Sequence, residues 1–465
     1  LLAAARLEAE AAFADGRLLL EKAVADPRHV EIQIIADRHG CVVHLGERDC
    51  SVQRRHQKLI EESPSPAMDP DLRRRMGEAA VAAARAIGYV GAGTLEFLLD
   101  AAGGFHFMEM NTRLQVEHPV TELVCGFDLV ELQLRVAAGE KLPFSQDEVA
   151  LSGHAIEARL CAEDPACDFM PQSGLLSLWQ PDGGVRVDHA LRSGVEIPSH
   201  YDSMMAKLVA HGPTREDARR RLAAALRDTI ALGVRTNAAY LADCLDHPQF
   251  SAGEATTAFI SRNHAALVEE EERGTARAAM IVAALLRAAP GIRLLHGYPA
   301  PLRLECQGML FTPSVRAMAD GRCEIAMAGQ DRLDFQLLGF AGIRRDFIAA
   351  GVKGTATILV EEDRILVHVD GRNREFRDCT FVPQHGNGLS SGDGRVRARL
   401  NGSVVAVEVA AGERVVKGQA LVLIEAMKMQ HVHAADLTGT ITAIHVSAGM
   451  QVANRDVLVE IRGDP

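Results

Sequence analysis

The chain has 465 residues, 48% of them hydrophobic and 24% charged, which is the composition of a folded protein with roughly three domains. Asp and Glu outnumber Lys and Arg by 62 to 50, and a formal net charge of −12 argues against general nucleic-acid binding. The nine cysteines include no C-x-x-C pair, which argues against a zinc ribbon or a disulfide framework and fits a reducing compartment. No hydrophobic run in the sequence reaches the roughly 18 residues of a membrane span.

The chain begins at Leu1 without an initiator Met, inside a stretch (1–20) that is typical of a helix followed by the approach to a strand. We therefore expect the natural polypeptide to be longer at this end. Up to about residue 265, strand-like runs alternate with helices rich in Ala, Arg and Leu, such as Asp71–Ile87 and Arg215–Ala231. This alternation predicts an α/β or α+β domain.

A basic cluster runs from Glu47 to Lys58, with the sequence ERDCSVQRRHQK. A run of charges is usually a solvated loop, and that interpretation stays open. In an acidic protein, however, a local concentration of Arg, His and Lys is suited to docking a phosphate or a carboxylate.

Two acidic residues are predicted to face each other across a hairpin. The loop Ala101–Gly104 pairs Asp100 with Phe105 and, counting back along both strands, Glu96 with Glu109. Like charges directly opposite are destabilising, and a divalent cation such as Mg²⁺ beside a phosphate site would compensate them. The alternatives are a register that is slipped by one residue, or carboxylates at a solvated edge.

The segment Glu109–Glu117 (EMNTRLQVE) carries a polar side chain at every second position. If the segment is extended, all of these groups lie on one face. They are Glu109, Asn111, Arg113, Gln115 and Glu117. Such a row of acids, amides and a cation is suited to an anion beside a metal, and the His118-Pro119 step is expected to end the strand.

The composition changes after the first domain. From about Ala265 to Ala289 the sequence predicts a charged, Ala-rich helix that stops at Pro290-Gly291. From Leu294 to Val382 we expect short alternating strands, for instance Thr357–Val360 and Arg364–Val369.

The last part of the chain contains an internal repeat. It follows a stretch with the composition of a flexible linker, Gln384–Gly394. Gly402–Gly412 and Gly439–Gly449 superimpose with an offset of 37 residues. Two strand-rich halves with the same pattern predict a small sandwich with approximate two-fold symmetry.

Lys428 lies between the two halves, in the sequence EAMKM of Glu425–Met429. A hairpin Lys is usually a solvated one, but here two Met residues flank it where turn-forming residues are normal. The motif resembles the biotin-attachment site of biotin carboxyl carrier domains, and this resemblance implies that biotin is amide-linked to Lys428. Lipoyl domains share the fold but typically have Asp-Lys-Ala at this turn.

Five upstream segments resemble the biotin carboxylase component of biotin-dependent carboxylases, an ATP-grasp enzyme. They are Glu21–Val30, Glu47–Glu62, Gly88–Phe97, Glu109–Thr121 and Gly153–Pro165. The resemblance implies an α+β multidomain protein. Its parts are an ATP-grasp biotin carboxylase domain lacking its N-terminal part (1–265), a helix plus antiparallel β-barrel docking domain (266–383), a linker (384–393) and a β-sandwich biotinyl, lipoyl-like carrier domain (394–465).

The same resemblance implies a role for each candidate site residue. The ligands of Mg²⁺ (or Mn²⁺) would be Glu96, Glu109 and Asn111. The ATP-binding residues would be Glu21 and Lys22 at the adenine, and His29, Gln53 and His56 at the ribose and phosphates. Bicarbonate would be bound by Lys58, Arg113, Gln115 and the backbone of Val116. Glu117 would be the general base, and Arg159 would stabilise the enolate form of biotin.

One departure from the family lies at the front of the chain. The glycine-rich phosphate loop and an ATP-binding Lys of the family precede the first matching segment, and no G-G-G-G-type loop occurs in the 465 residues. We therefore expect this chain alone to show little or no bicarbonate-dependent ATPase activity.

The order of carboxylase first and carrier last resembles the α subunit of an acyl-CoA carboxylase. This implies a carboxyltransferase β subunit and a biotin protein ligase as partners, a hetero-oligomer, and a cytoplasmic location (mitochondrial matrix in a eukaryote), without nucleic acid or membrane. The expected acyl group is methylcrotonyl- or geranyl-CoA, with acetyl- or propionyl-CoA as the alternative. A catalytically inactive carrier and assembly subunit is the rival hypothesis. Pyruvate carboxylase and urea carboxylase are disfavoured, because no carboxyltransferase-sized stretch lies between residues 265 and 394.

Overall fold

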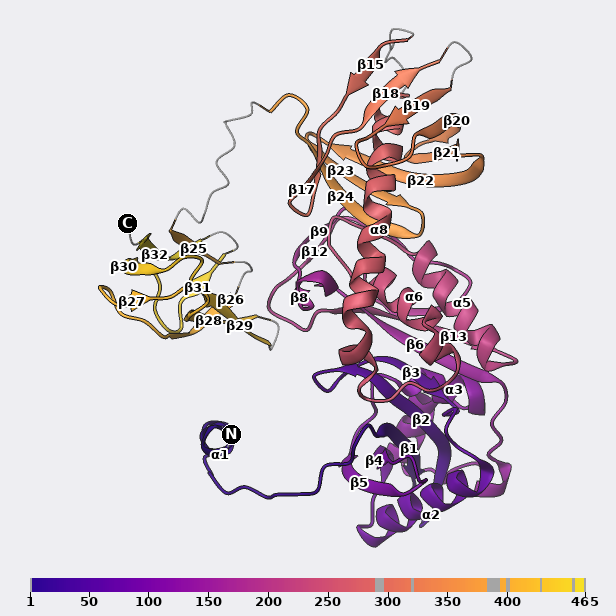
Figure 1. The fold of residues 1–465 in the computed structure, drawn as a ribbon. Helices are drawn as coiled ribbons and strands as arrows, with labels where there is room; N and C mark the ends of the chain where they lie inside the picture. The colour runs from indigo at the N-terminus through magenta and orange to yellow at the C-terminus, as the bar shows by residue number, and fades with distance from the viewer. Residues whose placement is uncertain are drawn as a thin grey trace.

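The structure is a computed structural model that describes residues 2–288, 297–318, 322–382, 394–398, 402–426, 429–453 and 456–463. It begins with helix α1 (Leu2–Phe13), which an extended segment separates from the first strand (Figure 1). The predicted linker 384–393 and the predicted biotin residue, Lys428, lie outside the described residues.

An eight-stranded antiparallel sheet forms the centre of the first half of the chain, in the order β11-β13-β6-β3-β2-β1-β4-β5. Its strands are β1 (Arg28–Ala36), β2 (Val42–Arg54), β3 (Gln57–Ser63), β4 (Gly91–Leu99), β5 (Phe105–Asn111), β6 (His154–Cys161), β11 (Arg186–His189) and β13 (Met204–Gly212). In β1, Val30, Ile32 and Ile34 pack against helix α2 (Pro70–Ala86). Because side chains alternate along a strand, Glu31 and Gln33 lie on the opposite face, which α3 (His118–Cys125) and α4 (Leu129–Ala137) cover.

Two predicted helices are observed with shifted ends. Helix α2 begins at Pro70 because the Asp69 side chain accepts a hydrogen bond from the backbone N–H of Leu72, which caps the first turn. Helix α5 (Arg215–Asp228) ends three residues before the predicted Ala231, because Ile230–Leu232 forms strand β14 and pairs with β10 (Leu178–Gln180).

Shorter elements complete this half. They are α6 (Ala238–Asp246), α7 (Pro248–Ser251), β7 (Glu163–Asp164), β8 (Met170–Pro171), β9 (Gly174–Leu176), β12 (Val195–Ile197) and two 3-10 turns, η1 (Gln146–Glu148) and η2 (Pro165–Cys167). Strands β9 and β12 form one small sheet, and β7 and β8 form another. One hydrophobic core joins α5 and α6 to strands β3, β6 and β13.

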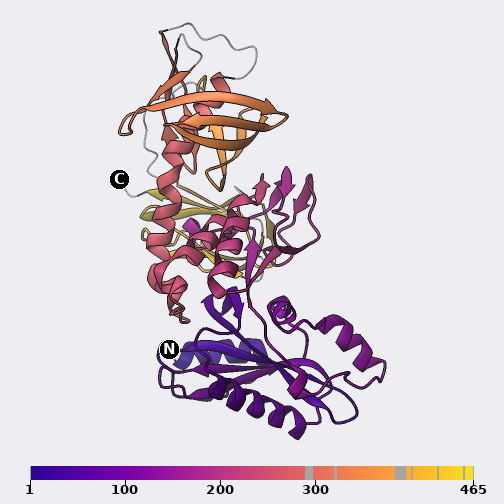
Figure 2. The same ribbon diagram turned by 90° about the vertical axis from the view of Figure 1, so that its right-hand side faces the viewer.

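The long helix α8 (Phe259–Arg287) runs from this half into a ten-stranded antiparallel sheet that curls around it (Figures 1 and 2). The strands are β15 (Pro299–Pro301), β16 (Leu304–Cys306), β17 (Met309–Phe311), β18 (Ser314–Ala317), β19 (Cys323–Ala326), β20 (Leu333–Ala341), β21 (Arg344–Ala349), β22 (Val352–Glu361), β23 (Arg364–Val369) and β24 (Arg372–Asp378). Every residue from Ala278 to Leu285 is buried, so this end of the helix is surrounded on all sides. The predicted helix is observed but begins at Phe259 rather than about Ala265, and its predicted stop at Pro290-Gly291 lies outside the described residues. The predicted strands Thr357–Val360 and Arg364–Val369 are confirmed within β22 and as β23.

The last unit is a sandwich of two four-stranded sheets, β25-β32-β30-β27 and β29-β28-β26-β31. Its strands are β25 (Arg395–Arg397), β26 (Gly402–Val407), β27 (Arg414–Val415), β28 (Ala420–Ala426), β29 (Met429–Ala434), β30 (Gly439–Ile444), β31 (Gln451–Val452) and β32 (Val457–Gly463). The offset of 37 residues carries β26, β27 and β28 end to end onto β30, β31 and β32. The predicted two-fold sandwich is therefore confirmed.

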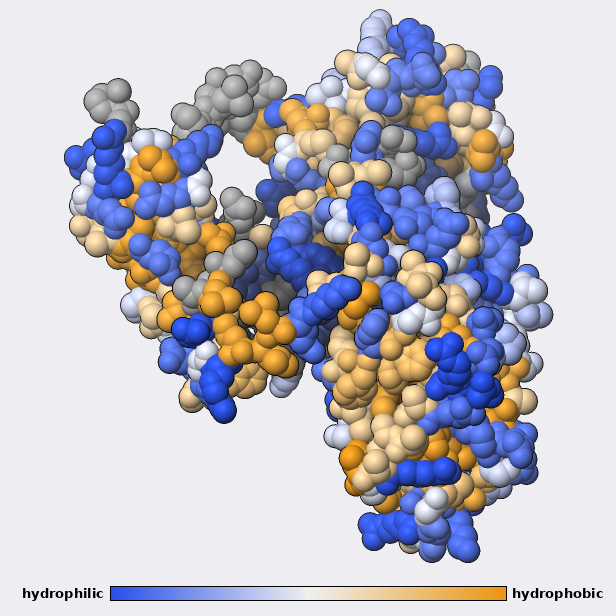
Figure 3. All heavy atoms as spheres, turned by 60° about the horizontal axis from the view of Figure 1, so that its bottom comes forward, coloured by the Kyte–Doolittle hydropathy of each residue, from blue (hydrophilic) through white to orange (hydrophobic). Residues whose placement is uncertain are grey.

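Hydrophobic and hydrophilic side chains are interspersed over the face seen in Figure 3. All nine cysteines lie in the described part of the chain, and none forms a disulfide. Among the described helices, none combines the length and the hydrophobicity needed to cross a membrane.

Candidate active site

A cavity of about 750 Å³ gathers most of the predicted site residues. Those that line it are His29, Gln53, His56, Lys58, Glu96, Glu109, Asn111, Arg113, Gln115, Val116, Glu117 and Arg159. Glu21 and Lys22 do not line it and are exposed in the segment before β1. The strands β1 to β6 bring these residues together from positions more than a hundred residues apart in the chain.

The two predicted metal-binding carboxylates are direct partners: Glu96 on β4 lies opposite Glu109 on β5. The Asn111 amide donates from Nδ2 to Glu96 Oε1 at 2.9 Å and to Glu109 Oε1 at 3.0 Å. The Asn111 amide thus bridges the two carboxylates. A 180° flip of the amide would place its oxygen, Oδ1, where Nδ2 now lies. Three hard oxygen ligands at one point fit Mg²⁺ by their chemistry.

The loop beside these carboxylates differs from the prediction. Phe105 pairs with Leu99, not with Asp100. The Asp100 side chain instead accepts hydrogen bonds from the backbone of Ala102 and Gly104, which closes a tight turn. A register shift at Met108 then restores the pairing of Glu96 with Glu109.

Glu96 is the centre of the polar contacts in this part of the cavity. His29 Nε2 lies 2.7 Å from Oε2, Gln115 Nε2 donates to Oε1 at 2.8 Å, and Lys58 Nζ lies 3.1 Å from Oε1. Burial by itself raises the pKa of Glu96, but the His29 contact and the Lys58 charge hold it well below its usual value. Glu96 is therefore a carboxylate, as a metal ligand must be.

The segment that follows β5 is not one extended strand, which corrects the prediction. Strand β5 ends at Asn111, and His118 begins α3 rather than ending a strand. Pro119 lies in the first turn of α3, and the Val116 carbonyl before it accepts a hydrogen bond from Lys207 Nζ at 2.5 Å. Gln115 and Glu117 are consequently buried in the cavity wall, whereas Arg113 stays exposed at its rim.

Glu117 is held between two cations. Lys58 Nζ donates to Oε1 at 2.5 Å, and Arg159 Nη2 donates to Oε2 at 2.9 Å. The Glu117 residue is only 2% exposed. A buried carboxylate with two charge-assisted hydrogen bonds has a fixed position and direction, which a general base requires.

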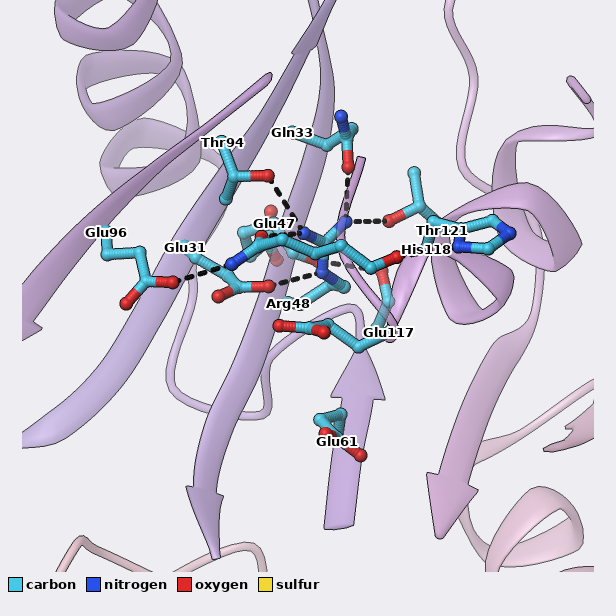
Figure 4. Close-up of polar contacts among 12 residues, drawn as sticks. Glu31, Gln33, Glu47, Arg48, Glu61, Thr94, Glu96, Glu117, His118 and Thr121 are labelled. Atoms are coloured by element: carbon cyan, nitrogen blue, oxygen red, sulfur yellow. Dashed lines mark hydrogen bonds and ion pairs between the residues drawn. The ribbon is translucent and has the colours of Figure 1, made fainter. Parts of the chain in front are cut away.

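Arg48 lies beneath these groups without any exposed surface. Its guanidinium donates to five acceptors at 2.5 to 3.2 Å: Glu31, Gln33, Thr94, Gln115 and Thr121. Figure 4 labels Glu31, Gln33, Thr94 and Thr121 around Arg48. Across the sheet, neighbouring strands place Arg48, Glu31, Glu96 and Glu109 in one row of direct partners. Three carboxylates thus follow one guanidinium in this row, and Lys58 Nζ, which contacts both Glu31 and Glu96, supplies a second positive charge.

Glu31 links the row to Lys58. Its Oε1 accepts from Arg48 Nε and its Oε2 accepts from Lys58 Nζ, each at 2.5 Å. Burial raises the pKa of Glu31, but the charges of Arg48 and Lys58 outweigh it and lower the pKa to about 2. Sequence reasoning missed Glu31, although its alternation with Val30 and Ile32 was a usable signal.

The basic cluster divides between structure and site. Arg54 pairs with Asp168 at 2.7 Å and lies over the Phe169 ring at 4.5 Å. Arg55 and His56 form the β2–β3 turn with φ of 46° and 66°, and His56 lines the cavity. The cluster is therefore neither a freely solvated loop nor wholly a docking site.

Three parts of the chain match known families. Residues 1–145 match the "Carbamoyl-phosphate synthase L chain, ATP binding domain", residues 157–262 the "Biotin carboxylase C-terminal domain", and residues 397–461 the family described as "Biotin-requiring enzyme".

Curated relatives and solved structures agree with these matches. The chain is 40% identical to the mitochondrial methylcrotonoyl-CoA carboxylase subunit alpha of Rattus norvegicus over 92% of this chain and 64% of that protein. It is 52% identical to the chloroplastic biotin carboxylase of Arabidopsis thaliana over 58% of this chain and 51% of that protein. The biotin carboxylase domain of the Hydrogenobacter thermophilus 2-oxoglutarate carboxylase, in complex with MgADP, ADP and bicarbonate, is 44% identical with a TM-score of 0.55, over 56% of this chain and 58% of that one. The chain thus spans less than two thirds of the length of these relatives.

Proposed function

This chain combines biotin carboxylase domains with a biotin-lipoyl domain and is related to methylcrotonoyl-CoA carboxylase α subunits, and from that premise we propose a biotin-dependent acyl-CoA carboxylase α subunit. Its reaction is the ATP- and bicarbonate-dependent carboxylation of biotin on Lys428, followed by transfer of the carboxyl group to an acyl-CoA. The observation that carries the proposal is Glu117, held between Lys58 and Arg159 in the cavity that also contains the Glu96–Glu109 pair.

Bicarbonate is a weak nucleophile, so it needs a base and an orienting cation. We assign the proton acceptor to Glu117 and the orienting groups to Lys58, Arg113, Gln115 and the backbone of Val116, all of which line the cavity. A bicarbonate oxygen then attacks the γ-phosphorus of ATP, and ADP leaves with the bonding electrons. We assign to Lys58 the balancing of the negative charge of the carboxyphosphate, and to Arg159 the stabilisation of the enolate form of biotin; both contact Glu117.

A magnesium ion held by Glu96, Glu109 and Asn111 would neutralise the phosphates of the nucleotide. Support for this site comes from the cross-strand carboxylates and the low pKa of Glu96. His29, Gln53 and His56 line the same cavity and are assigned to the ribose and phosphates. Glu21 and Lys22, which are exposed, are assigned to the adenine by resemblance alone.

The position of the sandwich supports delivery of biotin within one chain. Met170 of the carboxylase part packs against the hydrophobic core of the sandwich. Burial lowers the pKa of His431 on β29. The charges of Asp168, Arg54 and Arg55 lie close enough to influence this pKa as well. The β28–β29 hairpin, which leads to Lys428, therefore faces the β2–β3 turn beside the cavity (Figure 1).

The partners follow from the remaining unit. The curled sheet around α8 presents exposed non-polar side chains on β20 and β22: Leu338, Phe340, Val352 and Val360. We assign contact with a carboxyltransferase β subunit to this unit, because the chain is related to carboxylase α subunits. A biotin protein ligase would load Lys428. The relatives named above favour methylcrotonyl-CoA as acceptor, with geranyl-, acetyl- or propionyl-CoA as the alternatives.

The central test uses the polypeptide as it occurs naturally, loaded with biotin, together with ATP, Mg²⁺ and labelled bicarbonate. We expect label on the avidin-captured protein only when ATP is present, and a loss of roughly 10²–10⁴-fold in rate for Glu117→Gln. The matched control is Glu131→Gln, an exposed carboxylate on α4. If the wild-type protein carries biotin but takes no label, the inactive carrier and assembly function replaces this proposal.

The carrier residue is tested separately. Intact mass and an avidin blot should show one biotin on the wild-type chain and none on Lys428→Ala. Lys417→Ala, an exposed Lys in the same sandwich, should keep its biotin.

Magnesium-dependent nucleotide binding that Glu109→Gln leaves unchanged would contradict the assigned metal site.

A further inference from the structure

Two buried glutamates lie beneath the cavity and outside its lining. Glu61 on β3 and Glu157 on β6 are direct partners across the two strands, and neither has any exposed surface. Both carboxyl oxygens of Glu157 and Oε2 of Glu61 have no hydrogen-bond partner among the described residues. Directly opposed side chains have Cβ atoms about 5 Å apart, so three unpartnered oxygens share one small volume.

Arg159 connects this pair to the assigned base. Its Nε donates to Glu61 Oε1 at 2.5 Å, and its Nη2 donates to Glu117 Oε2 at 2.9 Å. The direction in which Arg159 presents its guanidinium therefore depends on the position and charge of Glu61. Glu157 has no hydrogen bond to the base or to the guanidinium, and its direct neighbour across the strands is Glu61, although its charge also acts on Arg159.

The charged and titratable groups around the pair come from every neighbouring element. They are Cys50 on β2, Lys58 on β3, Arg159 on β6, Lys207 on β13 and Glu117 before α3. The two Lys residues are engaged elsewhere, since Lys58 Nζ binds Glu117 and Lys207 Nζ binds the Val116 carbonyl. Two ionised carboxylates would thus share a single bound guanidinium, which is strongly unfavourable in a buried site.

Protonation of one of the two carboxyl groups relieves this repulsion, and Glu157 is the favourable site. Arg159 binds Glu61 and therefore favours the carboxylate there, whereas no described cation is hydrogen-bonded to Glu157. Burial raises the pKa of both carboxyl groups, but at Glu61 the charge of Arg159 opposes the rise, whereas at Glu157 the pKa lies well above its usual value and the charge of Glu61 raises it further.

We propose that Glu157 is a neutral carboxylic acid that donates a hydrogen bond to Glu61 Oε2, and that it acts as a positioning residue by keeping Glu61 as the anion that directs Arg159 toward Glu117. The positioning role rests on the proposed function, whereas the proton rests on the strand pairing, the burial and the unpartnered oxygens of this pair. The proton stays on Glu157 throughout, and no bond to a substrate is formed or broken there.

Infrared spectroscopy of the chain tests the proton directly, because a protonated carboxyl group has a carbonyl absorption that a carboxylate lacks. At neutral pH we expect one such band that Glu157→Gln removes. The matched control, Glu78→Gln on the exposed face of α2, should leave the band unchanged. A carboxylic acid spectrum that is identical in the wild-type chain and Glu157→Gln would overturn the proposal.

The pH dependence of unfolding gives an independent test. The native state holds a proton that the unfolded chain releases above about pH 4.3, the ordinary Glu value. The wild-type chain therefore loses stability relative to Glu157→Gln as the pH rises, and the ratio of their unfolding constants grows about tenfold per pH unit until native Glu157 ionises. A ratio that does not change with pH would mean that Glu157 is ionised, and the proposal would fall.

Two isosteres test the positioning role in the complete enzyme. Glu157→Gln retains an N–H donor toward Glu61, whereas Glu157→Met has a similar shape without a donor. We expect the kcat for biotin carboxylation to stay within about threefold of wild type for Gln and to fall about tenfold or more for Met, with KM for ATP unchanged in both. Equal losses for Gln and Met would overturn the positioning role. Failure of the proposed function itself would be recognised by an inactive wild-type enzyme that still shows the infrared band and the pH-dependent unfolding ratio.

Discussion

The floor of the cavity and the core of the sandwich are both built from antiparallel strands, yet opposite kinds of side chain hold them together. In the cavity floor, Glu31, Arg48 and Glu96 are buried at 0 to 3% exposure. Arg48 donates a hydrogen bond to Glu31, and Lys58 contacts both Glu31 and Glu96. In the sandwich, the core cluster consists of Val, Ala, Leu and Ile alone. Hydrogen bonds between charges are directional, whereas burial of non-polar area is not.

This difference explains why only one of the two regions repeats. The identical pairs Val415/Val452 and Leu421/Leu458 fill equivalent places in the sandwich, because each needs only a non-polar neighbour. Arg48 needs five specific acceptors that come from β1, β4, α3 and the loop before α3. A cavity floor of this kind tolerates loss of one member poorly, whereas a non-polar core loses stability in proportion to the volume removed.

The largest effect on stability is expected for Arg48→Met. The change leaves Glu31 buried with one of its two cations gone, and breaking a buried ion pair in this way costs about 3–5 kcal/mol in free energy of unfolding. Urea unfolding measures the change. Arg74→Met, which removes a pair with 56% and 62% exposed side chains, should cost no more than about 1 kcal/mol. Equal effects at the two positions would remove the distinction between the two regions.

The next largest effect is expected at low pH, which should destabilise the cavity floor more than the sandwich. The pKa of Glu31 is lowered to about 2 from an ordinary 4.5, so its contribution is present above pH 4.5 and is lost as the pH falls toward 2. The loss amounts to roughly 3 kcal/mol. Among the described residues of the sandwich, no carboxylate is buried and His433 is the one buried ionisable side chain. We therefore expect the methyl NMR signals of the sandwich to stay dispersed at a pH where those of β1 and β2 have collapsed. Simultaneous collapse would contradict the comparison.

The repeat leads to a third prediction, a loss of about 2 kcal/mol in the free energy of unfolding for each of two variants. Val422→Ala and Val459→Ala each remove two methyl groups from equivalent strands, β28 and β32, and both side chains are at most 1% exposed. Thermal unfolding of the sandwich should therefore show nearly equal losses for the two variants. A difference larger than either loss would show that the two halves are not energetically equivalent.

The smallest expected effect lies at the contact between the two regions. Arg54→Lys removes the planar group that lies over Phe169 while it pairs with Asp168, at an expected cost of about 1 kcal/mol. The same turn leads to Met170, which packs on the sandwich. Faster hydrogen exchange on β29 in this variant, without a change in the sandwich core, is the expected readout. If hydrogen exchange on β29 is unchanged in this variant, the contacts of Asp168 do not contribute to the packing of the sandwich against Met170.

The amino-acid sequence predicts the sandwich almost completely, because its repeat is local and its alternation is simple. It also predicts Glu96 opposite Glu109, although the loop pairing behind that prediction was wrong by one residue. Two errors cancelled there: the turn takes in Asp100, and the bulge at Met108 adds the residue back. Neither the turn nor the bulge can be counted from hydrophobic alternation alone.

Arg48 shows why the remainder of the site could not be predicted. In the sequence it is one of several cations in a basic cluster, and nothing local distinguishes it from the exposed Arg55. Its burial depends on strands and a helix that arrive from other parts of the chain. Glu61, Glu157 and Lys207 were missed for the same reason, because a charge inside a strand reveals its role only when the partner strand is known.

The two-fold symmetry of the sandwich also has a mechanical consequence. Gly394, where the described sandwich begins, bonds to Ile461 at the end of β32, and the symmetry relates that end to the end of β28. Gly394, where the chain enters the sandwich, and the β28–β29 hairpin therefore lie at opposite ends of the domain (Figure 1). One continuous hydrophobic core connects these two ends, so the folded domain itself, rather than a long side chain, sets the distance between its point of attachment and the hairpin.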